Sequence, residues 1–520
     1  MSTGLKVVYT LAGAVLALGI STPLLAGSLT VKTEQGKVHG KTINDGKVNA
    51  FLGLPYAAPP VGDLRWKAPE PAASWKSERD ATQYGARCIP GHASPDMAFL
   101  DNGPSEDCLY LNVYAPAGAT ATSKLPVMFW IHGGGFMAGA GGEPRHNGDF
   151  LPLKGVVLIT FNYRLAVFGF LATSDLAKEA NGTAGNYGFM DMIAALQWTK
   201  ANIRVFGGDP GNVTIFGESA GSFAVSTLVA SPLARGLFQK AIGESGAAFG
   251  GSLAYDPLVV REKKDGDWVE SMGVKSLAEL RALPADKIHE GSLKRGMLGF
   301  PPNIDGKVLV EPVPDTYAAG RQAHVPLLAG WNADEGVIRV RDGVTVDSWK
   351  DMAAKLYPDR TAEFLALYPG DTDAQALRSA IDYYGDSFIA FSTWKWLEAQ
   401  AKTGESPVYR YHFELAAPPS KYFKGAYAFH ADDIEYVFGT LDTRPESAWR
   451  PEDRKMSELF MSYWTNFAKT GDPNGPGLPP WPRYDKDGSI VHLDSTVTAG
   501  PDAARPRYEF LLKGMPTFKF

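Results

Sequence analysis

One serine stands in a glycine-framed turn that could make its hydroxyl a nucleophile. Residues 214–222 read Thr-Ile-Phe-Gly-Glu-Ser-Ala-Gly-Ser, so Ser219 lies in the pattern Gly-x-Ser-x-Gly between Gly217 and Gly221. The β-branched and aromatic residues before the pattern predict a short buried strand, and residues 222–230, which lack Gly and Pro, predict a helix. So sharp a turn from strand to helix strains the backbone at Ser219 and places its hydroxyl at a helix N-terminus, where developing negative charge is favoured.

A second glycine-rich segment follows another predicted strand. Residues 126–131 are mostly apolar and run directly into residues 132–136, His-Gly-Gly-Gly-Phe. Consecutive glycines let main-chain N–H groups face a ligand without intervening side chains. A phosphate cradle would require Gly-Lys-Ser/Thr next, and none follows. The loop is therefore predicted either to bind an oxyanion or to be a structural turn.

A serine hydroxyl is a weak nucleophile, so a base must take its proton and a carboxylate must orient that base. Of the nine histidines, His430 fits the base best, because it lies in a loop of aromatic and small residues after the last long strand, downstream of Ser219. We interpret His132 as shaping the glycine loop, His412 as a packed or edge residue of a strand, and His492 as part of a C-terminal hairpin.

The carboxylate that orients the base should follow a strand between the serine and the histidine. Residues 326–332 form a predicted strand, and Asp334 and Glu335 come directly after it. Because side chains alternate along a strand, one of the two points toward the site and the other away. The residue pattern alone leaves both as candidates.

The elements that must position these groups alternate along the chain. Strands are predicted near residues 109–114, 126–131, 156–163, 213–216, 238–243, 326–332 and 407–415, with helices between many of them. This alternation predicts an α/β fold with a largely parallel central sheet and helices on both faces. The charged stretch 256–297 is expected to form a helical lid insertion, and a short hairpin is expected to end the chain. No linker divides residues 27–520, so we expect a single domain.

Composition is that of a globular protein rather than of a nucleic-acid binder. The 520 residues are 45% hydrophobic and 21% charged, which is enough to bury a large core. The net charge of −6 is spread without long runs. This argues against nucleic acid or an anionic membrane surface as a partner.

The first 26 residues have the features of a secretory signal peptide. Lys6 precedes an almost wholly apolar run that Pro23 breaks, and Ala26 provides a small residue for cleavage. The run is short for a membrane span, although an uncleaved anchor is the alternative. Ser28 stands where the lipidated cysteine of a lipobox would lie. We therefore expect no stable membrane anchor and a secreted or periplasmic protein.

Cys88 and Cys108 are the only cysteines. Export permits a disulfide between them, and closing a loop of this length would contribute about 3 kcal/mol of stability. Two buried thiols are the alternative, and the exported context favours the disulfide.

Several segments together resemble the type-B carboxylesterase/lipase family, which includes the cholinesterases, and point to a secreted bacterial member. The resemblance covers about residues 28–510 and implies the α/β-hydrolase fold. The segments that carry it are 106–113 (Glu-Asp-Cys-Leu-Tyr-Leu-Asn-Val), 132–136, 162–164 (Asn-Tyr-Arg), 206–210 (Phe-Gly-Gly-Asp-Pro), 217–221, 334–336 (Asp-Glu-Gly) and 430–439.

The resemblance also implies roles for individual residues. It makes Ser219 the nucleophile, His430 the base, and Glu335 rather than Asp334 the acid. It further implies an oxyanion hole formed by the N–H groups of Gly134, Gly135 and Ala220. Glu218 and Ser245 would support the triad from beside it. Cys88 and Cys108 would form a disulfide of the family.

The implied function is hydrolysis of a small-molecule carboxylic ester through an acyl-enzyme on Ser219, with no metal or organic cofactor. Amides, carbamates or lactones are alternative substrates for the same site, and a non-catalytic cholinesterase-like binding module is the alternative from another class. The loop between the cysteines lacks the tryptophan with which cholinesterases stack a quaternary ammonium, which argues against choline esters. Arg339 follows the acid strand and is either a solvent-facing residue or a candidate contact for a substrate carboxylate.

Overall fold

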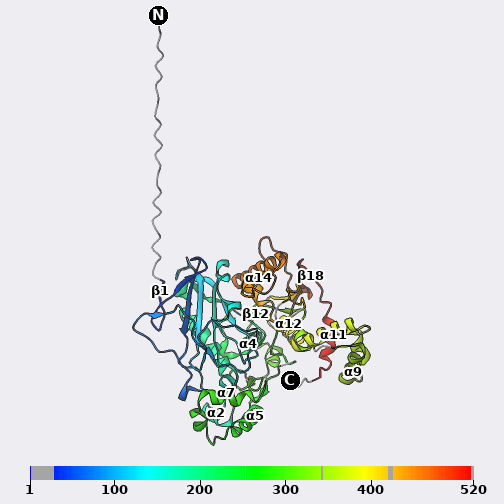
Figure 1. Cartoon of the computed structure of the whole chain (residues 1–520), viewed down its shortest axis with the longest axis horizontal. Coiled ribbons are helices and arrows are strands. Elements are labelled where there is room, and N and C mark those ends of the chain that lie inside the picture. The colour runs from blue at the N-terminus through cyan, green and yellow to red at the C-terminus, as the bar shows by residue number, and fades with distance from the viewer. Residues whose placement is uncertain (2–28, 252, 297, 341–342, 420–424, 517–520) are drawn as a thin grey trace.

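The computed structural model describes the whole chain except residues 2–28, 252, 297, 341–342, 420–424 and 517–520 (Figure 1). The predicted signal peptide therefore lies outside the described residues, apart from Met1. Within the part that is described, no helix combines the length and the apolar character that crossing a bilayer requires.

An eleven-stranded sheet forms the centre of the molecule, in the order β18-β17-β16-β15-β12-β11-β9-β10-β8-β4-β3. The strands from β17 to β10 in this order run parallel, and antiparallel strands complete both edges, so the predicted, largely parallel sheet is confirmed. The strands are β3 (Lys41–Ile43), β4 (Val48–Pro55), β8 (Tyr110–Pro116), β9 (Leu125–Ile131), β10 (Val157–Phe161), β11 (Gly208–Glu218), β12 (Lys240–Glu244), β15 (Leu327–Asn332), β16 (Val408–Phe413), β17 (Ile490–Leu493) and β18 (Thr498–Gly500).

Both faces of this sheet are buried, which explains why its central strands are apolar at successive positions. In β9, Val127, Phe129 and Ile131 pack into one core cluster, whereas Met128 and Trp130 pack into another. The helices that contribute to the first cluster include α3 (Tyr187–Asn202), α4 (Ala220–Ala230) and α12 (Phe391–Thr403), and those of the second include α13 (Ile434–Phe438) and α14 (Pro451–Thr470). The predicted helices on both faces are thus confirmed.

Two groups of helices are inserted between strands of the sheet. The first, α5 (Leu258–Ser271), α6 (Leu277–Ala282) and α7 (Ala285–Leu293), occupies the charged stretch that was predicted to be helical. The second, α9 (Val346–Leu356), α10 (Thr361–Leu367) and α11 (Asp373–Gly385), lies between β15 and β16 in the chain. In Figure 1 the first group lies at the bottom of the molecule and the second at its right-hand side. That the first group acts as a lid remains a prediction.

The end of the chain differs from the expectation. Strands β17 and β18 form the predicted hairpin, but helix α16 (Arg505–Leu512) follows it. Pro506 lies in the first turn, where a missing N–H does no harm, and Tyr508 and Leu511 lie three residues apart on the buried face. The prediction that the hairpin closes the chain is therefore wrong.

The predicted disulfide is present in the structure. Cys88 and Cys108 are joined, with their Cα atoms 4.9 Å apart, and both side chains are buried. Cys108 lies just before β8, so the bridge ties the intervening loop to the beginning of a strand of the central sheet.

Candidate active site

Four neighbouring strands of the sheet end at the same edge, and each is followed by one candidate residue. Strands β11, β12, β15 and β16 lie side by side and parallel. Ser219 follows β11, Ser245 follows β12, Glu335 follows β15 and His430 lies in the loop after β16. Because the carboxyl ends of parallel strands meet at one edge, residues far apart in the sequence meet there.

The serine lies in the strained turn that the sequence predicts. Ser219 has φ 53° and ψ −122°, a backbone conformation that residues with a side chain rarely adopt, between the end of β11 and the start of α4. A Cβ atom on Gly217 or Gly221 would lie 2.5 or 1.9 Å from the carbonyl oxygen of Ile131. The two glycines are therefore required because the turn packs directly against the end of β9.

The structure brings the serine, the histidine and one of the two candidate acids into a chain of hydrogen bonds. Nε2 of His430 lies 2.9 Å from Oγ of Ser219, and Nδ1 of His430 lies 2.6 Å from Oε2 of Glu335. The other oxygen of Glu335 accepts hydrogen bonds from the Ser245 hydroxyl at 2.6 Å and from the main-chain N–H of Asn332 at 3.0 Å. Both oxygens of this buried carboxylate are thus held in place.

Asp334, the other candidate acid, pairs with Arg378 rather than with the imidazole, and it fixes the loop that carries His430. Its carboxylate accepts a hydrogen bond from the N–H of Ala428 at 2.9 Å, and its own N–H donates to the carbonyl of Ala428 at 2.8 Å. The side-chain amide of Asn332 donates to the carbonyl of Phe429 at 2.8 Å. Residues at the end of β15 therefore hold the two residues that precede His430.

A second carboxylate borders the pair of reacting groups. Oε1 of Glu218 lies 3.4 Å from Nε2 of His430, and its side chain is buried. Burial raises the pKa of Glu218 to about 8. Burial lowers the pKa of His430, but the charges of Glu218 and Glu335 outweigh it and raise that pKa to about 9. Both carboxylates therefore favour the protonated form of the imidazole.

The glycine loop lies directly against the serine. A Cβ atom on Gly133 would lie 2.7 Å from Oε2 of Glu218 and 3.3 Å from Cβ of Ser219. Gly134 and Gly135 have φ values of 96° and 66°, which favour glycine. Within the described part of the chain, neither of their N–H groups has a hydrogen-bond acceptor.

The first residue of α4 and the histidine that begins the glycine loop also lie beside the serine or the loop. Ala220 is the first residue of α4, so its N–H has no acceptor within the helix and lies beside Ser219. His132 stacks on Tyr163 with ring centroids 4.3 Å apart, and burial lowers its pKa to about 4. A neutral, stacked imidazole fits the predicted role of shaping the loop.

Phe388 was not found by sequence reasoning, yet it contacts the imidazole. It lies in a π-helical turn (Asp386–Ala390) between α11 and α12, and its ring meets that of His430 edge-on, 5.1 Å between centroids. The guanidinium of Arg339 lies over the same ring, 4.0 Å from its centroid. Burial lowers the pKa of Arg339. Arg339 is thus separated from the imidazole by one aromatic ring, and no local pattern signals the contact.

Asp433 was missed as well, although it lies only three residues after His430. It accepts hydrogen bonds from the Asn332 amide at 3.2 Å and from the Tyr411 hydroxyl at 2.9 Å. These contacts join the residues after His430 to β15 and β16. The adjacent acids at positions 432 and 433 are the only sequence signal that could have drawn attention to it.

Comparison with known proteins shows the family of the chain. The sequence model described as "Carboxylesterase family" matches residues 27–511. The chain is 36% identical to the para-nitrobenzyl esterase of Bacillus subtilis (strain 168), over 93% of this chain and 99% of that one, and 35% identical to the fumonisin B1 esterase of Sphingopyxis macrogoltabida, over 90% and 87%. A solved structure titled PNB esterase superposes with a TM-score of 0.77 at 35% identity, over 93% of this chain and 99% of that one.

Proposed function

Because this chain belongs to the carboxylesterase family and is a serine hydrolase of carboxylic esters, we propose that Ser219, His430 and Glu335 form its catalytic triad. The observation that carries the proposal is the chain of two hydrogen bonds, 2.9 Å from Ser219 to His430 and 2.6 Å from His430 to Glu335. Hydroxyl, imidazole and carboxylate in this order let a base activate the serine while the acid orients the base.

The first half of the reaction forms an acyl-enzyme. Oγ of Ser219 attacks the ester carbonyl while Nε2 of His430 takes the hydroxyl proton, and the carbonyl electron pair moves onto oxygen. The N–H groups of Gly134, Gly135 and Ala220 donate to this oxyanion. Collapse of the intermediate breaks the bond to the alcohol, which leaves with the proton from His430.

The second half repeats these steps with water. His430 takes a proton from a water molecule that attacks the acyl carbon, and the same N–H groups stabilise the second oxyanion. Collapse breaks the bond to Oγ of Ser219, which recovers its proton from His430 as the carboxylic acid leaves. In both halves Glu335 stabilises the imidazolium, and Ser245 keeps the Glu335 carboxylate in position.

Glu218 is proposed to adjust the protonation of His430 rather than to react. Its carboxylate oxygen lies 3.4 Å from Nε2 of His430 and its side chain is buried, so a change in its charge acts on the imidazole through a medium of low dielectric constant.

We further propose that Arg339 contacts a carboxylate on the substrate. Its guanidinium is stacked on Phe388, and the same ring contacts the imidazole of His430, so an acidic group on the acyl or alcohol part of a bound ester could reach it. Arginine is well suited to this role because its planar donors match a carboxylate. A substrate preference for acidic esters would follow.

Export is also part of the proposal. Residues 1–26 would be removed as a signal peptide, and residues 27–520 would act as one secreted or periplasmic catalytic domain. The buried disulfide between Cys88 and Cys108 supports an oxidising location, and the family match begins at residue 27.

Labelling with a fluorophosphonate tests the triad. Ser219→Ala should abolish both labelling and ester turnover above background, whereas Ser222→Ala, three residues later in α4, should retain labelling. Labelling of the Ser219→Ala protein would overturn the assignment. A panel of matched esters, amides and carbamates then defines which acyl compounds the site accepts.

A further inference from the structure

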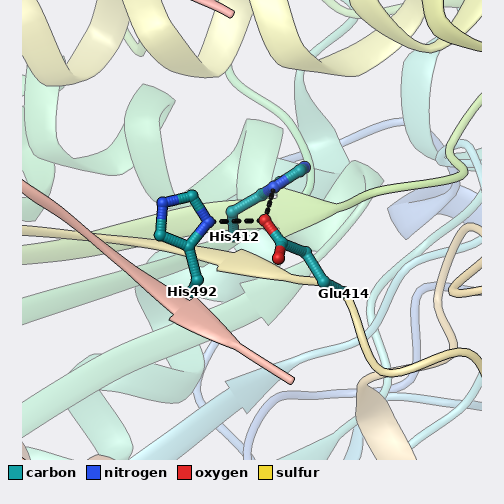
Figure 2. A group of neighbouring side chains, drawn as sticks. All are labelled: His412, Glu414 and His492. Carbon is teal, nitrogen blue, oxygen red and sulfur yellow. Dashed lines mark hydrogen bonds and ion pairs between the residues drawn. The ribbon is translucent and has the colours of Figure 1, made fainter. Parts of the chain in front are cut away.

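Three side chains that are potential metal ligands meet on one face of the sheet, at the ends of β16 and β17. His412 and His492 are paired in register on these two parallel strands. Glu414 lies two residues after His412, so its side chain emerges on the same face. The Nδ1 atoms of His412 and His492 each lie 2.6 Å from the same carboxylate oxygen, Oε1 of Glu414. Figure 2 shows both rings turned toward this oxygen.

We propose that His412, His492 and Glu414 bind a divalent transition-metal ion such as zinc. Two imidazoles and one carboxylate are ligands that zinc uses in proteins, and the three ligand atoms lie within 4.8 Å of one another. The ion would take the place of the two protons now directed at Glu414, and each imidazole would keep a proton on Nε2. Water would complete a tetrahedral site, because three protein ligands leave one position open.

The surroundings are compatible with a bound cation. The side chains of His412, Glu414 and His492 are 23%, 29% and 26% exposed, so ions and water can reach them. Within the described part of the chain, the ion-pair partners of Glu414 are these two imidazoles.

A nearby positive charge does not occupy the site. Arg410 lies on the same face of β16, one pleat before His412. Its guanidinium is paired with Asp502 and lies over the ring of Trp331, 4.2 Å from the centroid. Arg410 therefore has its own carboxylate, which leaves Glu414 available to a metal.

Among the described residues, the contacts of His412 and His492 are with Glu414, Trp331 and each other rather than with the triad, so the expected effect is on stability. The bound ion would join β16 to β17. Strand β17 also pairs with β18, the last strand at this edge of the sheet. An ion that binds only the folded chain raises the free energy of unfolding, and at saturating concentrations this rise grows with the logarithm of the ion concentration. The sequence shows no ligand spacing of this kind, because His492 lies 78 residues after Glu414.

Metal binding to the full-length, untagged chain tests the proposal. After treatment with a chelator, equilibrium dialysis against zinc should give one tightly bound ion per chain, which magnesium does not displace. His412→Gln, His492→Gln and Glu414→Gln should each weaken zinc binding by more than about tenfold. His324→Gln is the matched control, because Nδ1 of His324 also lies near a carboxylate, 3.5 Å from Glu405, and it should bind zinc like the parent chain.

A second measurement does not depend on the folding of the variants. Cobalt(II) added to the parent chain should give the visible absorption of a tetrahedral nitrogen–oxygen site, and the melting temperature should rise with zinc concentration and fall back on chelation. The proposal is overturned if the parent chain binds no zinc at millimolar concentration. It is also overturned if the three ligand variants, folded by circular dichroism, bind zinc as tightly as the parent chain does.

Discussion

Asp334 and Ala428 are joined by two hydrogen bonds, one between their main chains and one to the Asp334 carboxylate, although 94 residues separate them. The N–H of Asp334 donates to the carbonyl of Ala428, and the Asp334 carboxylate accepts the N–H of Ala428. The loop that carries His430 is thereby fixed to the end of β15, the strand that also presents Glu335. The residue beside the acid thus positions the base.

Loss of this contact should reduce turnover without removing any reacting group. We expect Asp334→Ala to lower kcat by about 10–100-fold, because a displacement of the imidazole by about 1 Å has consequences of this size. Asp334→Asn keeps an oxygen that can accept the Ala428 N–H and should retain most of the activity. Steady-state kinetics on a neutral ester measure both. Full activity in Asp334→Ala would show that the contact does not position His430.

The pH profile of ester hydrolysis should be displaced toward alkaline pH. His430 must be neutral to accept the serine proton, and its pKa is raised to about 9, so kcat/KM should rise with pH above the ordinary histidine range. Removing the Glu218 charge takes away a group that stabilises the imidazolium. Glu218→Gln should therefore move the midpoint to lower pH, by about one unit. A midpoint unchanged by this isosteric substitution would contradict the assigned coupling.

Arg339 should affect acidic substrates more than neutral ones. In Arg339→Ala, kcat/KM for an ester that bears a free carboxylate should fall by about 10-fold or more relative to its neutral methyl-ester counterpart, because a charged hydrogen bond contributes about 1.5–3 kcal/mol. Arg339→Lys keeps the charge and should lose less. Equal losses on both substrates would mean that Arg339 only supports the ring of Phe388.

The disulfide should contribute measurably to stability. Replacing Cys88 and Cys108 together by alanine should lower the free energy of unfolding by about 3 kcal/mol, because the bridge closes a loop with a sequence separation of 20 residues. Thermal unfolding with and without a reducing agent measures this. The reductant should lower the melting temperature of the parent chain and leave that of the double variant unchanged. A parent chain that melts at the same temperature under both conditions would contradict a stabilising role.

The sequence by itself determined the features that depend on a few consecutive residues. Gly217 and Gly221 around Ser219, and the glycines at 133–135, are dictated by backbone conformation and close approach, so their residue types can be read directly. The apolar strands between helices likewise predicted the parallel sheet. Each of these signals is local, because the physical requirement is met within one turn or one strand.

Only the tertiary structure decided which side chains meet. The residue pattern left Asp334 and Glu335 as equal candidates, since alternation along a strand defines two faces but not which of them the neighbouring loop covers. Phe388 reaches His430 from a helical insertion, and His492 reaches His412 and Glu414 across a strand pairing. Such contacts join segments that are distant along the chain, and they exist only once the strands have taken their order in the sheet.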